Sequence, residues 1–417
     1  MTRRKWFNPI LIVALGIFLL ISYRLIFPVN QGQVGLKLLW WSGSSLILGS
    51  FISYAIYWPA QARKFQRIQK DYRVVAIVPA FNEETHLLHQ SLESILNQSF
   101  PVSAIHVVDD GSVTKLVELV HPKITYHYQS NQGKRYAQKK ALDSLNPQDY
   151  NYVLAVDSDS VLDYQAVENL VRTFEGDSQL KACTGVVLTR NRKKNLITKV
   201  ADLNIGITCL LGRPIRSLIG SLETTSGALA LYASEVVFDH LEEYVTSGTY
   251  SDDRQLCLYS LLAGKAVGIS EAIVYSEMPE DIEGTVKQRL RWAKGSWKAV
   301  PFQLKHLTFK QLFFPLLGMG YLISLPFFVV TLGVAAYYGF YSLIMTYIFV
   351  RLGIRYLQSL VYLAGRSTII KKEYLLYMLL IIPLEFLFNS IVLIYLKYKA
   401  LFYLKETDWL TRKVPEL

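Results

Sequence analysis

The chain has 417 residues, of which 51% are hydrophobic and 18% charged, and it carries a formal net charge of +11. It is richer in apolar residues than an average soluble protein, and it is too long for one simple domain. No nucleic-acid-binding module or long basic tract accompanies the charge, so we expect anionic lipid or an anionic substrate as partner and no nucleic acid.

Residues 1–60 are predicted to form two transmembrane helices. A basic start, Thr2-Arg3-Arg4-Lys5, precedes an apolar run from Pro9 to Phe27, and a second run extends from Leu36 to Trp58. No small-residue cleavage site separates the two runs, which argues against a cleaved signal peptide. Because Lys and Arg residues flank both outer ends, we expect the amino terminus and the next domain in the cytoplasm.

Residues 61–280 have the composition of a globular domain with alternating strands and helices. Val74–Val78 is an apolar strand, Asn82 suits the cap of a following helix, and Ile105–Val108 is a second strand. Tyr152–Val156 is predicted to be a third, buried strand. This order predicts a parallel-rich, doubly wound α/β sheet.

Acidic pairs follow two of these strands, Asp109 with Asp110 and Asp157 with Asp159. In doubly wound sheets ligands bind beyond the carboxyl ends of the strands, where all four carboxylates fall. The i, i+2 spacing places Asp157 and Asp159 on one side of an extended backbone, about 7 Å apart. Such a pair suits a hard divalent cation that carries a phosphate group, although an isolated Asp-x-Asp is more often a polar loop.

Two basic stretches lie between these landmarks. Asn131–Arg135 contains a glycine followed by Lys134 and Arg135, which suits donors aimed at a diphosphate. Arg190–Asn195 is a second basic loop, for which a solvated turn is an equally good interpretation.

A third acidic pair, Asp252 and Asp253, opens a predicted helix with a leucine stripe. A carboxylate at a helix start often serves only as a cap. Here the pair is also the acidic group available as a general base opposite the metal site. The preceding stretch, Thr224–Tyr232, is predicted to be a tight turn entering a strand.

Residues 281–309 form a basic amphipathic segment, predicted to lie at the membrane surface. Apolar segments predicted to be transmembrane or channel helices then resume within residues 310–400: Gln311–Tyr337, Gly339–Leu363 and Tyr374–Leu396. The middle segment carries Arg351 and Arg355 on one helix face and is the expected non-spanner. The chain would then cross the membrane four times, or another even number, and the tail, residues 401–417, would be cytoplasmic.

Together these motifs resemble the processive family 2 glycosyltransferases, which are membrane synthases of cellulose, chitin, poly-N-acetylglucosamine and hyaluronan. The resemblance is carried by Pro79-x-x-Asn82-Glu83, Asp109-Asp110-Gly111-Ser112, Asp157-Ser158-Asp159, Asp252-Asp253 and Gln288-x-x-Arg291-Trp292. It implies a GT-A-like glycosyltransferase domain inserted between transmembrane helices, and a tail with a Trp-x-Thr-Arg motif.

Within that family the likeness is greatest to short bacterial hyaluronan synthases. Gly133–Gln138 is similar to their Gly-Lys-Arg-His-Ala-Gln, and Arg190-Asn191-Arg192 to their Arg-Asn-Arg. Ser251-Asp252-Asp253-Arg254 stands where they have Gly-Asp-Asp-Arg. The chain departs from their pattern at Leu203–Leu222 and at Thr225, which replaces a cysteine. In the tail, leucine replaces the glycine of their Trp-Gly-Thr-Arg.

The resemblance implies a role for each motif. Asp159, alone or with Asp157, would hold Mg²⁺ or Mn²⁺, and Asp253, next to Asp252, would be the catalytic base. Trp292 would stack beneath the terminal sugar of the acceptor. The expected nucleotide-sugar ligands are Asp109, Asp110, Lys134, Arg135, Asp157, Gln288, Arg291, Trp409 and Arg412. Ser226 and Gly227 are expected to border the acceptor.

The function so implied is an inverting, processive transfer from UDP-sugars that builds an extracellular or capsular polysaccharide and exports it across the plasma membrane. Hyaluronan, made from UDP-GlcNAc and UDP-GlcA, is the best single expectation. The alternatives are a synthase of another β-linked polymer, a non-processive enzyme that loads one sugar onto a lipid carrier, and a transport or scaffold protein with an inactive transferase domain.

Overall fold

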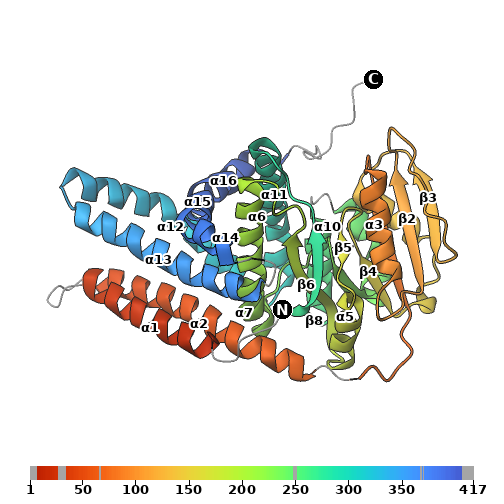
Figure 1. Cartoon of the computed structure of the whole chain (residues 1–417), viewed down its shortest axis with the longest axis horizontal. Helices are drawn as coiled ribbons and strands as arrows, with labels where there is room; N and C mark the ends of the chain where they lie inside the picture. Colours follow the sequence, from red (N-terminus) through yellow and green to blue (C-terminus); the bar gives the residue numbers. More distant parts are fainter. Residues whose placement is uncertain are drawn as a thin grey trace.

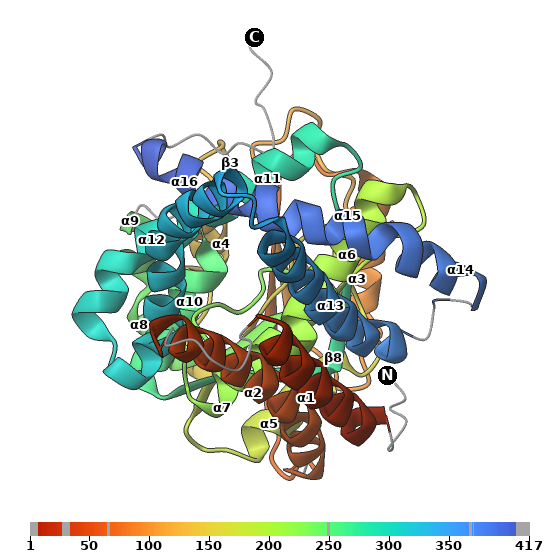
Figure 2. The same ribbon diagram turned by 90° about the vertical axis from the view of Figure 1, so that its left-hand side faces the viewer.

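The computed structural model describes residues 7–26, 34–64, 67–247, 251–366, 369 and 371–405. The chain folds into a sheet domain at one end and an assembly of long helices at the other (Figure 1). The helices α1, α2, α12 and α13 extend away from the sheet, and Figure 2 looks onto their end of the molecule.

The centre of the domain is one eight-stranded sheet with the order β3-β2-β1-β4-β7-β6-β8-β5. Its strands are β1 Val74–Ala80, β2 Ala104–Asp110, β3 Ile124–Gln129, β4 Tyr152–Ala155, β5 Val161–Leu162, β6 Leu180–Thr189, β7 Ala230–Ala233 and β8 Lys265–Ser276. Strands β3, β2, β1 and β4 are parallel, β7 is antiparallel to both β4 and β6, and β8 is parallel to β6. The predicted parallel-rich α/β fold is therefore confirmed.

Helices of the domain pack around this sheet. They are α3 Thr85–Leu96, α4 Lys134–Leu142, α5 Ala166–Glu175, α6 Leu196–Ile207, α7 Arg213–Leu218, α8 Ser234–Asp239, α9 Leu241–Thr246, α10 Asp252–Ala263 and α11 Ile282–His306. Helix α3 buries Leu88, Leu92 and Ile95, as the leucine spacing of its sequence requires. A π-helical stretch, Thr208–Gly212, joins α6 to α7.

Two sequence predictions for this domain were incorrect in detail. Strand β3 was not predicted, although Ile124–Gln129 alternates β-branched and aromatic residues with polar ones. Asn82 does not cap α3, because the helix begins at Thr85 with Glu84 before it. Asn82 instead has φ of 49° and joins two turns: its backbone N–H donates to Ser112 Oγ (2.8 Å), and its Oδ1 accepts from Val113 N (2.8 Å).

The helical part of the molecule, called the long helices below, contains seven α-helical elements among the described residues. They are α1 Phe7–Ile26, α2 Val34–Lys64, α12 Phe309–Tyr337, α13 Tyr341–Gly365, α14 Lys371–Leu376, α15 Ile382–Leu387 and α16 Ile394–Phe402. Two π-helical stretches, Tyr377–Ile381 and Phe388–Leu393, connect α14, α15 and α16 into one helical run. Among the described residues, Phe309–Tyr337 and Lys372–Phe402 are long and apolar enough to cross a membrane. The apolar parts of α1 and α2, Ile10–Arg24 and Gly43–Ile56, are shorter.

Helix α6 joins the sheet domain to these helices through buried polar contacts. Asp202 accepts from Thr189 N (2.7 Å) and from the Tyr362 hydroxyl of α13. Asn204 Nδ2 donates to Glu385 Oε1 (2.7 Å) of α15, and a Cβ at Gly206 would lie 2.4 Å from the Tyr362 ring. The contact between the two parts of the molecule is therefore close-packed and specific.

Candidate active site

At one end of the site, backbone donors hold the carboxylates that follow β2. Asp110 Oδ1 accepts from Gln132 N (2.9 Å) and Gln129 Nε2 (2.7 Å), and its Oδ2 accepts from Gly133 N (2.8 Å). Asp109 Oδ1 accepts from Ser112 N (2.9 Å), which closes the turn after the strand. Gly111 has φ of +76°, and a Cβ there would lie 2.5 Å from Asn131 N. These contacts bring the β2 turn against the loop that precedes Lys134.

The turn after β4 is joined to the turn after β1. Ser158 Oγ donates to Glu83 Oε2 (2.6 Å), so the Asp157-Ser158-Asp159 segment is fixed to the Asn82-Glu83 segment. Asp157 is 35% exposed, and Asp159 is half-buried and accepts from Ser160 Oγ (3.2 Å). The turns after three neighbouring parallel strands thus meet at one edge of the sheet, as predicted.

The turns after β1, β2 and β4 form the end of the site that is expected to bind the nucleotide, called the nucleotide end below. Lys134 links this end to the third acidic pair, Asp252 and Asp253. Its Nζ lies 2.7 Å from Asp157 Oδ1 and 2.6 Å from Asp252 Oδ2, and its side chain is 18% exposed. Burial works to lower the pKa of Lys134, but the two carboxylates raise it above its ordinary value. Gly227 lies beside the pair, because a Cβ there would be 3.1 Å from Lys134 Nζ and 3.4 Å from Asp157 Oδ2. A larger residue at position 227 would therefore crowd these charges.

Asp253, at the start of α10, is held differently from Asp252. Its Oδ1 accepts from Ser251 Oγ (2.6 Å) and from Arg254 N (2.8 Å), and Thr225 Oγ1 donates to its backbone oxygen (2.9 Å). Burial, and next the neighbouring Asp252 charge, raise the pKa of Asp253. Burial also opposes ionisation of Asp252, but Lys134 overcomes it and lowers the Asp252 pKa. One carboxylate of the pair is thus a fixed anion and the other a stronger base.

Arg135 binds a different segment from Lys134, although its charge, after that of Lys134, also lowers the pKa of Asp252. Its Nη1 donates to Tyr244 O (2.9 Å), its Nη2 to Ser251 O (3.2 Å), and its guanidinium lies over the Tyr244 ring, 4.9 Å from the centroid. The residue is only 9% exposed. In this arrangement it holds the segment that leads into α10, and its expected contact with a diphosphate stays a prediction.

A second, partly buried ionic cluster was not predicted from the sequence. Glu223 accepts from Arg216 Nη1 (2.6 Å), Arg254 Nη1 (2.9 Å) and Gln303 Nε2 (3.2 Å). Burial would raise the pKa of Glu223, but Arg254 and Arg216 lower it to about 2. This carboxylate therefore stays charged and ties α7, α10 and α11 together. In the sequence, Arg254 of the Ser251-Asp252-Asp253-Arg254 motif hinted at a buried ion pair, but the motif did not indicate that Glu223 would be its partner.

Helix α11 carries the Gln288-x-x-Arg291-Trp292 motif and packs against Ser251, the residue before Asp252. After Lys134 and Arg135, the Arg291 charge also lowers the pKa of Asp252. A Cβ at Gly295, one helical turn later, would lie 2.9 Å from Ser251 Cβ. Gln288 Nε2 lies 3.9 Å from Met278 Sδ, and Trp292 is 39% exposed.

Three further predicted site residues need separate comment. Ser226 is half-buried in the turn before β7, where its backbone oxygen accepts from Leu229 N (3.2 Å). Trp409 and Arg412, predicted nucleotide ligands, lie outside the described residues. Their roles stay predictions.

The predicted metal ligands form an open arrangement. Across the described ranges, no three His, Cys, Asp or Glu side chains come together as a closed metal site. Asp157 and Asp159 offer carboxylate oxygens, the donor type that Mg²⁺ and Mn²⁺ prefer. Asp157 is paired with the Lys134 ammonium, so a divalent cation would compete with that ammonium for the carboxylate. The residues fit a cation that takes its other ligands from a diphosphate.

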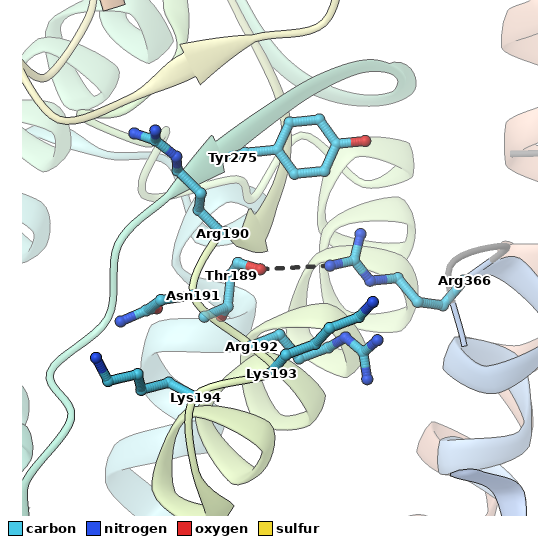
Figure 3. Close-up of a pocket in the computed structure, with 8 residues that line it drawn as sticks. All are labelled: Thr189, Arg190, Asn191, Arg192, Lys193, Lys194, Tyr275 and Arg366. Atoms are coloured by element: carbon cyan, nitrogen blue, oxygen red, sulfur yellow. Dashed lines mark hydrogen bonds between the residues drawn. The ribbon is translucent and has the colours of Figure 1, made fainter. Parts of the chain in front are cut away.

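The basic loop after β6 lines a separate pocket of about 660 Å³. Figure 3 shows Arg190, Arg192, Lys193, Lys194 and Arg366 around it, with Arg366 Nη2 donating to Thr189 O (3.4 Å). Two of these cations are partly neutralised, because Arg192 Nη1 lies 3.2 Å from Glu373 Oε1 and Arg366 Nε 3.5 Å from Asp202 Oδ2. Arg192 thus anchors this turn to α14, while Lys193 and Lys194 remain exposed.

A comparison with protein families matches residues 72–295 to the family described as glycosyltransferase like family 2. The chain belongs to this family. The matched residues include every acidic pair described above, so the family resemblance inferred from the motifs is confirmed and the chain is a glycosyltransferase.

Individual relatives agree with this assignment. The chain is 29% identical over 364 residues to a hyaluronan synthase of Streptococcus pyogenes serotype M1, covering 82% of this chain and 84% of the relative. It is 28% identical over 262 residues to an N-acetylglucosaminyltransferase of Azorhizobium caulinodans, covering 57% and 65%. A mannosyltransferase of Pyrobaculum calidifontis, solved with GDP-Man and Mn²⁺, superposes with a TM-score of 0.50 at 16% identity, covering 87% and 98%. This last likeness supports the GT-A-like fold.

Proposed function

We propose that this family 2 glycosyltransferase polymerises a polysaccharide from UDP-sugars at the cytoplasmic face of a membrane and exports it through its own helices. The observation that carries the proposal is the Lys134 bridge between Asp157 and Asp252. It holds the nucleotide end of the site next to the helix that carries Asp253. The long match to a hyaluronan synthase, which extends beyond the transferase domain, supports the polymerase over a lipid-carrier enzyme.

The chemistry proposed is a single inverting displacement. Asp253 takes the proton from the acceptor hydroxyl while that oxygen bonds to the anomeric carbon of the donor sugar and UDP leaves with the electrons of the broken bond. The raised pKa of Asp253 suits this role, because a stronger base accepts a proton more readily at neutral pH. Trp292 would lie beneath the terminal sugar of the acceptor.

The leaving diphosphate is proposed to bind between cations. Lys134 is paired with Asp252, the Arg291 charge also acts on that carboxylate, and the tail adds Arg412 in this proposal. Asp159 and Asp157 would hold Mg²⁺ or Mn²⁺, which when bound neutralises the departing diphosphate. Asp109 and Asp110 would fix the uracil and ribose through the turns that they organise.

Hyaluronan is the product that we propose first. Purified full-length protein in lipid nanodiscs would be given UDP-GlcNAc, UDP-GlcA and UDP-Glc, singly and in pairs, and the product would be sized. A long polymer that needs both UDP-GlcNAc and UDP-GlcA and is degraded by hyaluronidase supports hyaluronan. A long polymer from one sugar indicates another β-linked polymer, and a single transferred sugar indicates a lipid-carrier enzyme. Absence of transfer from every UDP-sugar would indicate an inactive domain.

The proposed topology has an even number of crossings, with residues 61–280 and the tail in the cytoplasm. Arg355 of α13 is bonded to Glu385 and is only 8% exposed, which gives one of the two arginines of that helix an internal partner. An Arg412→Cys variant in intact cells should resist an impermeant thiol reagent and react after the cells are opened. Modification from outside would contradict the arrangement.

A further inference from the structure

Arg289 is a buried cation, and two of its three guanidinium nitrogens lack an acceptor among the described residues. The residue is 7% exposed, and its Nε and Nη2 have no hydrogen-bond partner among the described residues. Its guanidinium lies 4.4 Å from the Trp292 ring centroid and 5.9 Å from the Phe388 ring centroid. Aromatic faces stabilise a cation but do not accept its N–H groups as an oxygen would. Buried groups of this kind require an explanation, because leaving them unpaired is costly.

The charges around Arg289 do not balance. The carboxylate that acts on it, Glu385, is fully buried and already bonded to Arg355 and to Asn204 Nδ2 (2.7 Å). Among the described residues, two guanidinium groups and one carboxylate leave a surplus of one positive charge here. Two other buried arginines are each paired with one carboxylate: Arg192 with Glu373, and Arg366 with Asp202. Burial lowers the pKa of Arg289 to about 10, so the cation persists at neutral pH.

The position of Arg289 on α11 indicates which kind of molecule could reach it. It precedes Trp292 by three residues, so the two side chains share a face of α11. Phe388 belongs to the helical run that carries α15 and α16, so the guanidinium lies where α11 meets that run. A chain that leaves the acceptor site beside Trp292 toward those helices would reach Arg289 next.

We infer that Arg289 and Trp292 form a binding site for an acidic sugar of the nascent chain, in which the indole packs against the sugar ring and the guanidinium binds its carboxylate. The inference rests on the proposed polymerase function and makes it more specific. A carboxylate supplies two acceptor oxygens for the Arg289 fork, and its single negative charge cancels the surplus. A neutral sugar would leave that charge uncompensated.

The test measures the binding of two matched oligosaccharides to the full chain in phosphatidylcholine nanodiscs. One is a hyaluronan tetrasaccharide, and the other is the same tetrasaccharide with its carboxylates reduced to alcohols. We expect the wild-type protein to bind the acidic form about tenfold or more tightly than the reduced form, the usual scale for a hydrogen-bonded charge. Equal affinities would overturn the inference without any variant.

Variants locate the preference. Arg289→Gln should bind both tetrasaccharides equally, while its affinity for UDP stays unchanged. Arg289→Lys, which keeps the charge but loses the fork, should show an intermediate ratio. Lys287→Gln is the matched control: it removes one charge from the same helix, but Lys287 is 39% exposed and paired with Glu283. It should keep the wild-type ratio. An unchanged ratio in Arg289→Gln would overturn the assignment.

Two further outcomes separate this inference from others. If phosphatidylglycerol nanodiscs abolish the preference of the wild-type protein, a lipid phosphate occupies the site and the inference fails. If the enzyme uses no UDP-GlcA in the sizing experiment, hyaluronan as product fails, while the affinity ratio still reports on Arg289. If it makes hyaluronan but shows equal affinities, only the present inference fails.

Discussion

The carboxylates at the two ends of the active site are held by different kinds of donor. At the nucleotide end, Asp109 and Asp110 accept mainly backbone N–H groups from the turns around them. At the acceptor end, Asp252 depends on the Lys134 side chain, which also binds Asp157. Backbone donors are fixed once the turns form, whereas a lysine can change partners. The nucleotide end is thus preorganised, and the link between the ends is the part that substrate binding can rearrange.

The largest effect is expected at the nucleotide end, from Asp159→Asn. Loss of this carboxylate should abolish transfer and weaken UDP binding in the presence of Mg²⁺ or Mn²⁺, because the diphosphate loses the cation that binds it. Turnover and equilibrium UDP binding are the measurements. Asp149→Asn, which removes an exposed carboxylate remote from the cluster, is the control. Full activity of Asp159→Asn, or of the wild type in excess chelator, would refute the metal assignment.

The acceptor end should respond differently, because Asp253→Asn removes the base and leaves the nucleotide ligands in place. The asparagine oxygen can still accept from Ser251 Oγ and Arg254 N. Turnover should fall by at least about 10²-fold, with UDP-sugar binding retained. The wild-type rate should also fall as the pH drops through the raised pKa of Asp253, since protonation disables the base. Parallel losses of binding and turnover would make Asp253 structural.

Lys134→Met removes the link between the two ends. Asp252, 9% exposed at its side chain, would lose its cation, and Asp157, 35% exposed, would lose less. We expect the free energy of unfolding to fall by roughly 2–4 kcal/mol, somewhat below the scale for a fully buried pair because Asp157 is partly hydrated. Lys139→Met, which breaks exposed pairs with Asp143 and Glu242, should change it by at most about 1 kcal/mol. Similar thermal shifts in both variants would show that the link is not structural.

The smallest effect concerns the β2–β3 edge alone. His106 Nδ1 lies 2.9 Å from His127 Nε2, and burial, followed by the His127 charge, lowers the pKa of His106 to about 4. The folded state therefore resists a proton that the unfolded chain accepts near pH 6.5, so stability is lost as the pH falls from about 6.5 to 4. Between pH 7 and pH 5 the loss should be about 1–2 kcal/mol. His106→Gln should reduce this dependence, measured as the melting temperature at each pH. An equal pH dependence in the variant would assign it to other groups.

The same contrast explains what the sequence could predict. The strands β1, β2 and β4, the helices α10 and α11, and the meeting of Asp109 with Asp157 at one sheet edge follow from local patterns and a topological rule. The Lys134–Asp252 ion pair and the burial of Arg135 against Tyr244 join segments that are far apart in sequence. Their spacing carries no signal, because only the assembled fold decides which cation reaches which carboxylate.

The polar contacts of α6 limit how this molecule can be divided. Asp202 and Asn204, both buried, use partners on α13 and α15, and Gly206 accommodates the Tyr362 ring. A chain cut after α11 would expose this face and leave a carboxylate without the Tyr362 hydroxyl and the Arg366 guanidinium that accompany it. The transferase domain and the long helices should accordingly unfold as one cooperative unit, and a truncated catalytic fragment would be a poor substitute for the full chain.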